Sequence, residues 1–159
     1  MGKINYSRVI LGGIVAGLIA GFFDWFLNGV LMGQMWEDAM KSLNRPNAFS
    51  GAFLFCLFLA FSIGGILLVW VYAAIRPRFG AGVRTEVYAG LVVWAFAALL
   101  PNMMNAVTGL YSPRLMLYST LAGIVQTVVG TIAGAALYKE AESTPAGKPV
   151  AAAARQTMR

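Results

Sequence analysis

Four long apolar tracts, separated by shorter polar segments, dominate the pattern of this chain. They run from Val9 to Gly33, from Gly51 to Ile75, from Val87 to Gly109 and from Leu115 to Tyr138, and Asp24 is the only charged residue in any of them. A helix needs about 20 mostly apolar residues to cross a hydrocarbon core about 30 Å thick. The pattern therefore predicts an all-α fold with four membrane-spanning helices.

The segments between the tracts predict how the helices are joined. The second and third connections, "RPRFGAGVRTE" and "LYSPR", are short, so consecutive helices should be antiparallel neighbours in a four-helix bundle. In the first connection, Gln34 to Ser50, Trp36, Met40 and Leu43 recur at helical spacing before Pro46. We expect a short amphipathic helix there, lying at the membrane interface after the first span.

The chain divides into two parts at Tyr138. Residues 1–138 form the predicted four-span transmembrane domain. Residues 139–159 are polar and alanine-rich and contain two prolines. Such a segment buries too little apolar surface to form a core of its own. We expect it to be a polar cytoplasmic tail.

Composition supports a membrane protein, and the positions of the charged residues predict its orientation in the membrane. Apolar residues make up 59% of the chain and charged residues 11%, against roughly half and a quarter in soluble domains. Most Lys and Arg residues fall on one predicted side, which places both termini in the cytoplasm of a multi-pass inner-membrane protein. Contact with anionic lipid then accounts for the net charge of +6 without a nucleic-acid partner. The basic residues on that side are Lys3, Arg8, Arg76, Arg78, Arg84, Lys139, Lys148, Arg155 and Arg159.

Two further features of the chain narrow the possible functions. The first tract follows the basic residues Lys3 and Arg8, as the apolar core of a signal peptide would, but it is too long for such a core, so we expect it to remain as a span.

The chain has one cysteine, Cys56, and no histidine. Disulfide frameworks, most zinc and haem sites and the Ser-His-Asp system are therefore excluded. We expect no catalytic residues, no metal site and no cofactor.

Glycines and polar residues share one face in the first and fourth tracts. Gly13, Gly17, Gly21, Asp24 and Asn28 fall within an arc of about 80° at 100° per residue. Small residues let neighbouring helices approach closely in lipid, where packing is a main force between helices. We therefore expect the two faces to pack against each other, with bulky residues turned to lipid. The fourth tract carries Ser119, Gly123, Gln126, Thr127, Gly130 and Gly134 within an arc of about 100°.

Polar side chains also lie at matching depths. Asp24 and Asn102 each lie 15 residues into their tracts, about 22 Å along a helix, and Asn28 and Asn105 follow one turn later. Pro101 has no N–H, so the carbonyl of Ala97, four residues earlier, lacks its usual helical hydrogen-bond donor. Because intramembrane polar groups pair or serve function, we predict a cluster of Asp24, Asn28, Asn102, Asn105 and Gln126. It either pins the helices together or binds a proton or cation.

One stretch carries a resemblance to known proteins. "RVILGGIVAG", followed by "FLNGVLMGQMWEDAMKSLNRP", resembles the opening of small bacterial four-helix membrane proteins whose chemistry is uncharacterised. The resemblance covers about the first third of the chain. It implies a bacterial cytoplasmic membrane and no particular reaction.

Three functions remain open at this point. The first is a non-enzymatic protein that acts by helix packing, as an accessory or structural subunit or as a homo-oligomer, with lipid, other membrane subunits or itself as partners. The second is a small transporter or channel with Asp24 as an intramembrane proton or cation site. The third is copper handling through outer-side methionines, since thioethers bind Cu(I). Those methionines are Met32, Met35, Met40, Met103, Met104 and Met116.

Overall fold

The computed structural model describes residues 4–45 and 50–139, and all regular elements in these ranges are helices. Four segments are long and apolar enough to cross a membrane: Tyr6–Leu31, Gly51–Phe79, Val83–Val107 and Pro113–Ala135. The predicted all-α class and the presence of four potential membrane spans are therefore confirmed. The length and composition of these helices make this a multi-pass membrane protein.

Two of the four spans are interrupted by π-helix. The first consists of α1 (Tyr6–Asp24) and η1 (Trp25–Leu31), and the third of α4 (Val83–Trp94), η2 (Ala95–Leu99) and α5 (Leu100–Val107). The other two spans are the uninterrupted helices α3 (Gly51–Phe79) and α6 (Pro113–Ala135). The short helix α2 (Gly33–Ser42) lies within the connection for which an amphipathic helix was predicted. Pro46, its predicted stop, and the predicted tail beyond Lys139 lie outside the described residues.

Local sequence explains where the helices begin and turn. The side chains of Asn5, Ser50 and Ser112 each accept a hydrogen bond from the backbone N–H three residues later, which caps α1, α3 and α6. The turn between α3 and α4 contains Gly80 at φ 85° and Gly82 at φ 129°, conformations that favour glycine. These caps and glycines place the chain reversals at the ends of the spans.

Helix α3 is longer than the apolar pattern predicts. It continues past Ile75 through Pro77 to Phe79, so the second connection is only Gly80 to Gly82. Proline lacks an N–H and removes one helical hydrogen bond. Here it stands in the last turn of the helix, where that loss does not end the helix at once. Arg76 and Arg78 consequently belong to α3 rather than to a loop.

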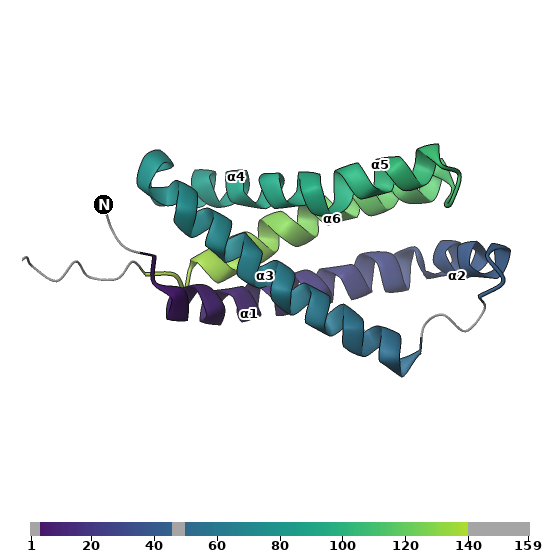
Figure 1. The fold of residues 1–159 in the computed structure, drawn as a ribbon, viewed down its shortest axis with the longest axis horizontal. Helices are drawn as coiled ribbons and strands as arrows, with labels where there is room; N and C mark the ends of the chain where they lie inside the picture. Colours follow the sequence, from purple (N-terminus) through teal and green to yellow (C-terminus); the bar gives the residue numbers. More distant parts are fainter. Residues whose placement is uncertain (1–3, 46–49, 140–159) are drawn as a thin grey trace, which may run out of the picture.

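The spans pack around α1 and α6. Helix α1 contacts both α3 and α6, α4 contacts α6 and α3, and α5 lies along α6. Figure 1 shows α3 crossing α1 and α6 diagonally. The buried core lies near the beginning of α1 and the ends of α3 and α6, where these helices converge. It contains Val9, Ala16, Leu68, Val69, Tyr72, Ala73, Ala89, Ala135 and Tyr138.

Glycines of α1 lie against the backbone of α3. A Cβ atom at Gly13 would stand 2.5 Å from the Ile66 Cα, and one at Gly17 would meet the Phe61 carbonyl oxygen. In return, a Cβ atom at Gly65 would collide with the backbone of Gly13 and Gly17. No side chain larger than hydrogen fits between these helices without moving a backbone.

The glycine face of α6 meets a different face of α1 from the one expected. A Cβ atom at Gly134 would stand 2.5 Å from the Gly12 carbonyl oxygen, and one at Gly130 would stand 3.0 Å from that of Ala16. Gly21 faces the Phe61 ring of α3, and Gly123 faces Ala98 and Trp94 of the third span. For the glycines the expected contact between the two faces is wrong, because Gly13, Gly17 and Gly21 contact α3, and Gly130 and Gly134 pack against the neighbouring face of α1. For the polar residues of the two faces the expected contact is found, because Gln126 and Ser119 donate hydrogen bonds to Asp24 and Asn28.

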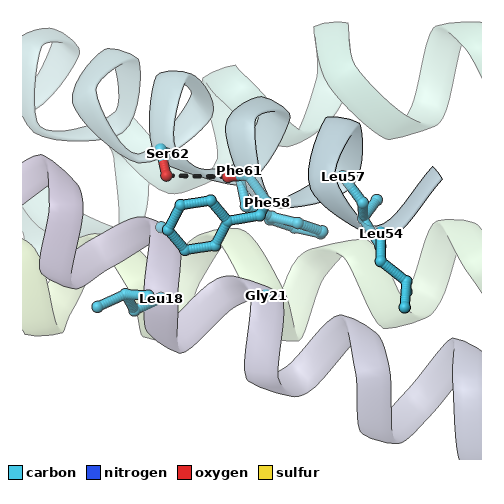
Figure 2. Close-up of a pocket in the computed structure, with 8 residues that line it drawn as sticks. Leu18, Gly21, Leu54, Leu57, Phe58, Phe61 and Ser62 are labelled. Atoms are coloured by element: carbon cyan, nitrogen blue, oxygen red, sulfur yellow. Dashed lines mark hydrogen bonds between the residues drawn. The ribbon is translucent and has the colours of Figure 1, made fainter. Parts of the chain in front are cut away.

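The first ten residues of α3 diverge from the rest of the molecule. Nine of these residues, 51–60, are exposed and the tenth, Leu57, is half-buried. A hollow of about 190 Å³ opens between this part of α3 and α1 (Figure 2). Phe58, Phe61 and Leu18 line it, and the Ser62 hydroxyl donates to the Phe58 carbonyl oxygen at 2.9 Å. The chain therefore leaves one half of a spanning helix largely uncovered.

Candidate functional site

A change of helix type occurs directly after the charged residue of the first span. Asp24 is the last residue of α1, and the seven residues of η1 follow with π-helical hydrogen bonding. The bond from the Met32 N–H to the Leu27 carbonyl oxygen, 3.1 Å, closes this segment over five residues instead of four. π-Helical turns are rare and occur frequently at functional sites.

Asp24 faces α6, and its carboxylate accepts two amide hydrogen bonds, one from its own span and one from α6. The Asn28 Nδ2 donates to the Asp24 Oδ1 at 2.8 Å, and the Gln126 Nε2 donates to the same oxygen at 3.1 Å. Gln126 is buried, with 9% of its surface exposed. No described Lys or Arg forms an ion pair with Asp24, so neutral amide dipoles alone stabilise its oxygen. A hydrogen bond from an amide to a carboxylate is stronger than one between two neutral groups.

Asn28 joins three helical elements through its single side chain. Besides donating to Asp24, it accepts at Oδ1 from the Ser119 hydroxyl of α6 at 2.9 Å and from the Trp36 Nε1 of α2 at 3.2 Å. The Trp36 ring also packs edge-on against Tyr111, with ring centroids 5.5 Å apart. These bonds attach α2 to the spans. We call Asp24, Asn28, Trp36, Ser119 and Gln126 the Asp24 network.

Asn102 and Asn105 do not belong to this network. The Asn102 Nδ2 donates to the Thr120 hydroxyl at 3.1 Å, and the Trp94 Nε1 donates to the Thr120 carbonyl oxygen at 2.8 Å. The Asn105 side chain forms no hydrogen bond with a described residue. Matching depth therefore does not bring the third span to Asp24, and the predicted five-residue cluster divides into the Asp24 network and a separate pair of contacts to α6.

Pro101 coincides with the second π-helix. Because proline has no N–H, the Ala97 carbonyl loses its usual helical donor. The preceding residues adopt π geometry, in which the Leu100 N–H donates to the Ala95 carbonyl oxygen. The unpaired Ala97 carbonyl predicted from the sequence thus lies inside a local change of helix type.

Other sequence candidates lie apart from the network. Arg114 does not serve as a cation for Asp24, because its Nε donates to the Tyr118 hydroxyl at 3.4 Å and the pair is exposed. Met103 and Met104 are exposed at 54% and 58%, whereas Met116 is buried at 2%. Within residues 4–45 and 50–139, no three His, Cys, Asp or Glu side chains come together as metal ligands.

Sequence reasoning missed two members of the network as partners of Asn28. Ser119 was placed on the small, polar face of the fourth tract, and Trp36 was assigned to the interface. Trp36 follows Asn28 by eight residues, and the intervening π-helix alters the angular relation that α-helical spacing would give. The sequence contains no signal for that interruption comparable to Pro101, which follows η2.

No protein-family model matches the chain, and no curated protein or solved structure is significantly similar to it. The chemistry available at the Asp24 network is that of one carboxylate with amide, hydroxyl and indole donors. Such a site can fix helices relative to one another, and it can hold a proton or a cation on the carboxylate.

Proposed function

We propose that this chain is a non-enzymatic inner-membrane protein that acts by helix packing and associates with a second copy of itself. In this proposal the spans form a four-helix bundle with both termini in the cytoplasm, and α2 lies at the outer interface. The observation that carries it is a second face of small residues on α3, turned away from every other span.

Small residues recur at every fourth position along this exposed part of α3. Ala52, Cys56 and Ala60 are exposed, and a Cβ atom added at Gly64 would meet no atom within 4 Å. At 100° per residue these four positions drift over about 120°, on the side of α3 roughly opposite the residues that face α1. Gly65, the next residue, is fully engaged with α1.

Lipid explains large exposed side chains but not this row of small ones. Apolar residues of any size are accommodated by acyl chains, whereas small residues at four-residue spacing permit close contact between helix backbones. The molecule already has such contacts within the chain, between Gly65 and the glycines of α1 and between Gly134 and Gly12. A second copy offers an identical face, and a two-fold axis would bring like residues together.

Cys56 provides a direct test because it is the only cysteine of the chain and is exposed on this face. Mild oxidation of membranes containing the protein should give a disulfide-linked dimer. A disulfide forms only where two Cα atoms come within about 7 Å. Gly64→Leu should reduce the dimer band strongly, because leucine separates the two backbones.

Phe55→Leu is the matched control, since Phe55 is exposed on the same half of α3 but outside the row. It should leave cross-linking unchanged. Absence of a dimer in the unmodified chain would reject self-association. Cross-linking of Cys56 to a different protein in native membranes would support the accessory-subunit form of the proposal instead.

The Asp24 network favours a second candidate, a small transporter or channel. Its supporting observation is a carboxylate inside a span with neutral partners only, directly before a π-helix. Both amide donors reach the same oxygen, Oδ1, so Asp24→Asn retains an acceptor for each. This substitution should preserve folding in either case. Loss of proton- or cation-coupled flux in proteoliposomes would support transport, and unchanged behaviour would leave helix pinning as the role of Asp24.

A further inference from the structure

An apolar groove runs between the end of α3 and the outer face of α4. Its volume is about 440 Å³, and its walls include Phe79 of α3 and Tyr88, Leu91 and Val92 of α4. Phe96, 72% exposed, marks its far end. The Phe79 and Tyr88 rings meet edge-on across it, with centroids 6.0 Å apart. The only polar group in these walls is the Tyr88 hydroxyl.

A guanidinium group stands at the end of the groove nearest the Gly80–Gly82 turn. The Arg84 Nε donates to the Tyr88 hydroxyl at 2.8 Å, and its Cζ lies 5.5 Å from the centre of the Tyr88 ring. Its remaining donors form no hydrogen bond or ion pair with a described residue. Arg84 is therefore held beside the groove with most of its donors available.

The charge around this end is positive. Arg78 is exposed in the last turn of α3, next to Phe79. The nearby acidic residue, Glu86, is 9% exposed and lies on the buried face of α4 with Ala89, away from Tyr88. An anion at the mouth of the groove would therefore meet Arg84, and among the residues that the structure describes no exposed carboxylate on α3 or α4 would compete with it.

The groove and the cations match the two parts of a phospholipid. From Arg84 to Phe96 the helix rises about 18 Å, close to the roughly 15 Å thickness of one leaflet of the hydrocarbon core. Basic pockets between membrane helices are known to bind anionic headgroups, and arginine forms paired hydrogen bonds with phosphate oxygens. We propose that this groove is a binding site for one anionic phospholipid, with its phosphate at Arg84 and an acyl chain between Phe79 and Phe96. The site does not depend on self-association through α3.

Native mass spectrometry of the full chain in detergent tests this directly, with phosphatidylglycerol and phosphatidylcholine of identical acyl chains as probes. The unmodified chain should bind one phosphatidylglycerol in preference to phosphatidylcholine. Arg84→Gln should weaken phosphatidylglycerol binding about fivefold, the contribution of one basic residue near a membrane surface, and should leave phosphatidylcholine binding unchanged.

The chain contains a matched control at its other end. Arg114 pairs with Tyr118 as Arg84 pairs with Tyr88, with its Cζ 5.7 Å from the ring centre, so Arg114→Gln removes the same charge from a similar setting. It should not alter binding. Equal loss in both variants would mean nonspecific attraction and would overturn the proposal.

Two further experiments test whether a lipid occupies the groove. Ala95→Trp places an indole in the wall of the groove and should reduce binding of phosphatidylglycerol while melting temperature confirms folding. Inorganic phosphate should not displace the lipid, because the acyl chain contributes to binding. Displacement by phosphate, equal binding of both lipids, or a second protein chain in place of lipid at this face would each contradict the site.

Discussion

Asn28→Ala is the most informative perturbation of the Asp24 network. The substitution removes three side-chain hydrogen bonds at once: one to Asp24, one from Ser119 and one from Trp36. Two of these connect η1 to other helices, so their loss should loosen both α6 and α2 from the first span. The helical backbone itself should remain, because alanine is a strong helix former.

The expected cost follows from the number of bonds. Side-chain hydrogen bonds between membrane helices contribute about 0.6 kcal/mol on average and up to about 1.7 kcal/mol. Three bonds therefore amount to about 2 kcal/mol, with about 5 kcal/mol as the upper bound. Asn105→Ala is the control, since Asn105 belongs to the corresponding turn of the third span and forms no side-chain hydrogen bond with a described residue. It should cost less than about 0.5 kcal/mol.

Unfolding in mixed micelles with increasing dodecyl sulfate measures both variants on the same scale. A double-mutant cycle of Asn28→Ala with Ser119→Ala isolates the bond between η1 and α6, with an expected coupling near 0.6 kcal/mol. Equal destabilisation by Asn28→Ala and Asn105→Ala, or a coupling of zero between Asn28 and Ser119, would refute the assignment of the network as a connection between helices.

Two further predictions concern packing and orientation. Gly65→Ala should destabilise the fold by about 1 to 3 kcal/mol through overpacking against Gly13 and Gly17, whereas the control Gly64→Ala should be nearly neutral. Unfolding midpoints of the two variants measure this difference, and similar midpoints would mean that α1 and α3 do not approach as described. A reporter that is active only in the periplasm should be active when fused after Arg45 and inactive at the C-terminus, because most basic residues lie on the proposed cytoplasmic side of the spans. The reverse pattern of activity would invert the proposed topology.

The sequence predicted the spans well because their signal is collective. Twenty or more apolar residues define a span regardless of any single side chain, so four helices follow from the pattern and the structure contains them. Their ends are less well determined. Hydropathy falls at Arg76, but backbone hydrogen bonding continues to Gly80, whose N–H still donates to the Arg76 carbonyl oxygen. Charge and helix termination are separate properties, and the pattern reports only the first.

The polar site was predicted in part. Asp24, Asn28 and Gln126 were expected together and lie within hydrogen-bonding distance. Asn102 was added because its depth matches that of Asp24, but depth specifies only one of the two coordinates needed. The other is the direction around the helix axis, and Asn102 points to Thr120. Helical spacing can supply that direction only while the helix stays regular, and η2 ends at Leu99, shortly before Asn102.

The π-helix η1 makes the chain tolerant of a one-residue change in length at this point. A π-helical bond joins residues five apart, where an α-helical bond joins residues four apart, so removing one residue between Trp25 and Leu31 would allow ordinary α-helical bonding. The turn would hold one residue fewer, and the segments beyond it would keep nearly their present direction relative to α1. Trp36 would stay beside Asn28, and α2 would keep its place against the spans. A relative of this protein with a one-residue gap here should therefore keep the indole contact as long as both residues are retained, whereas the same gap inside the regular part of α1 would turn everything beyond it by about 100°.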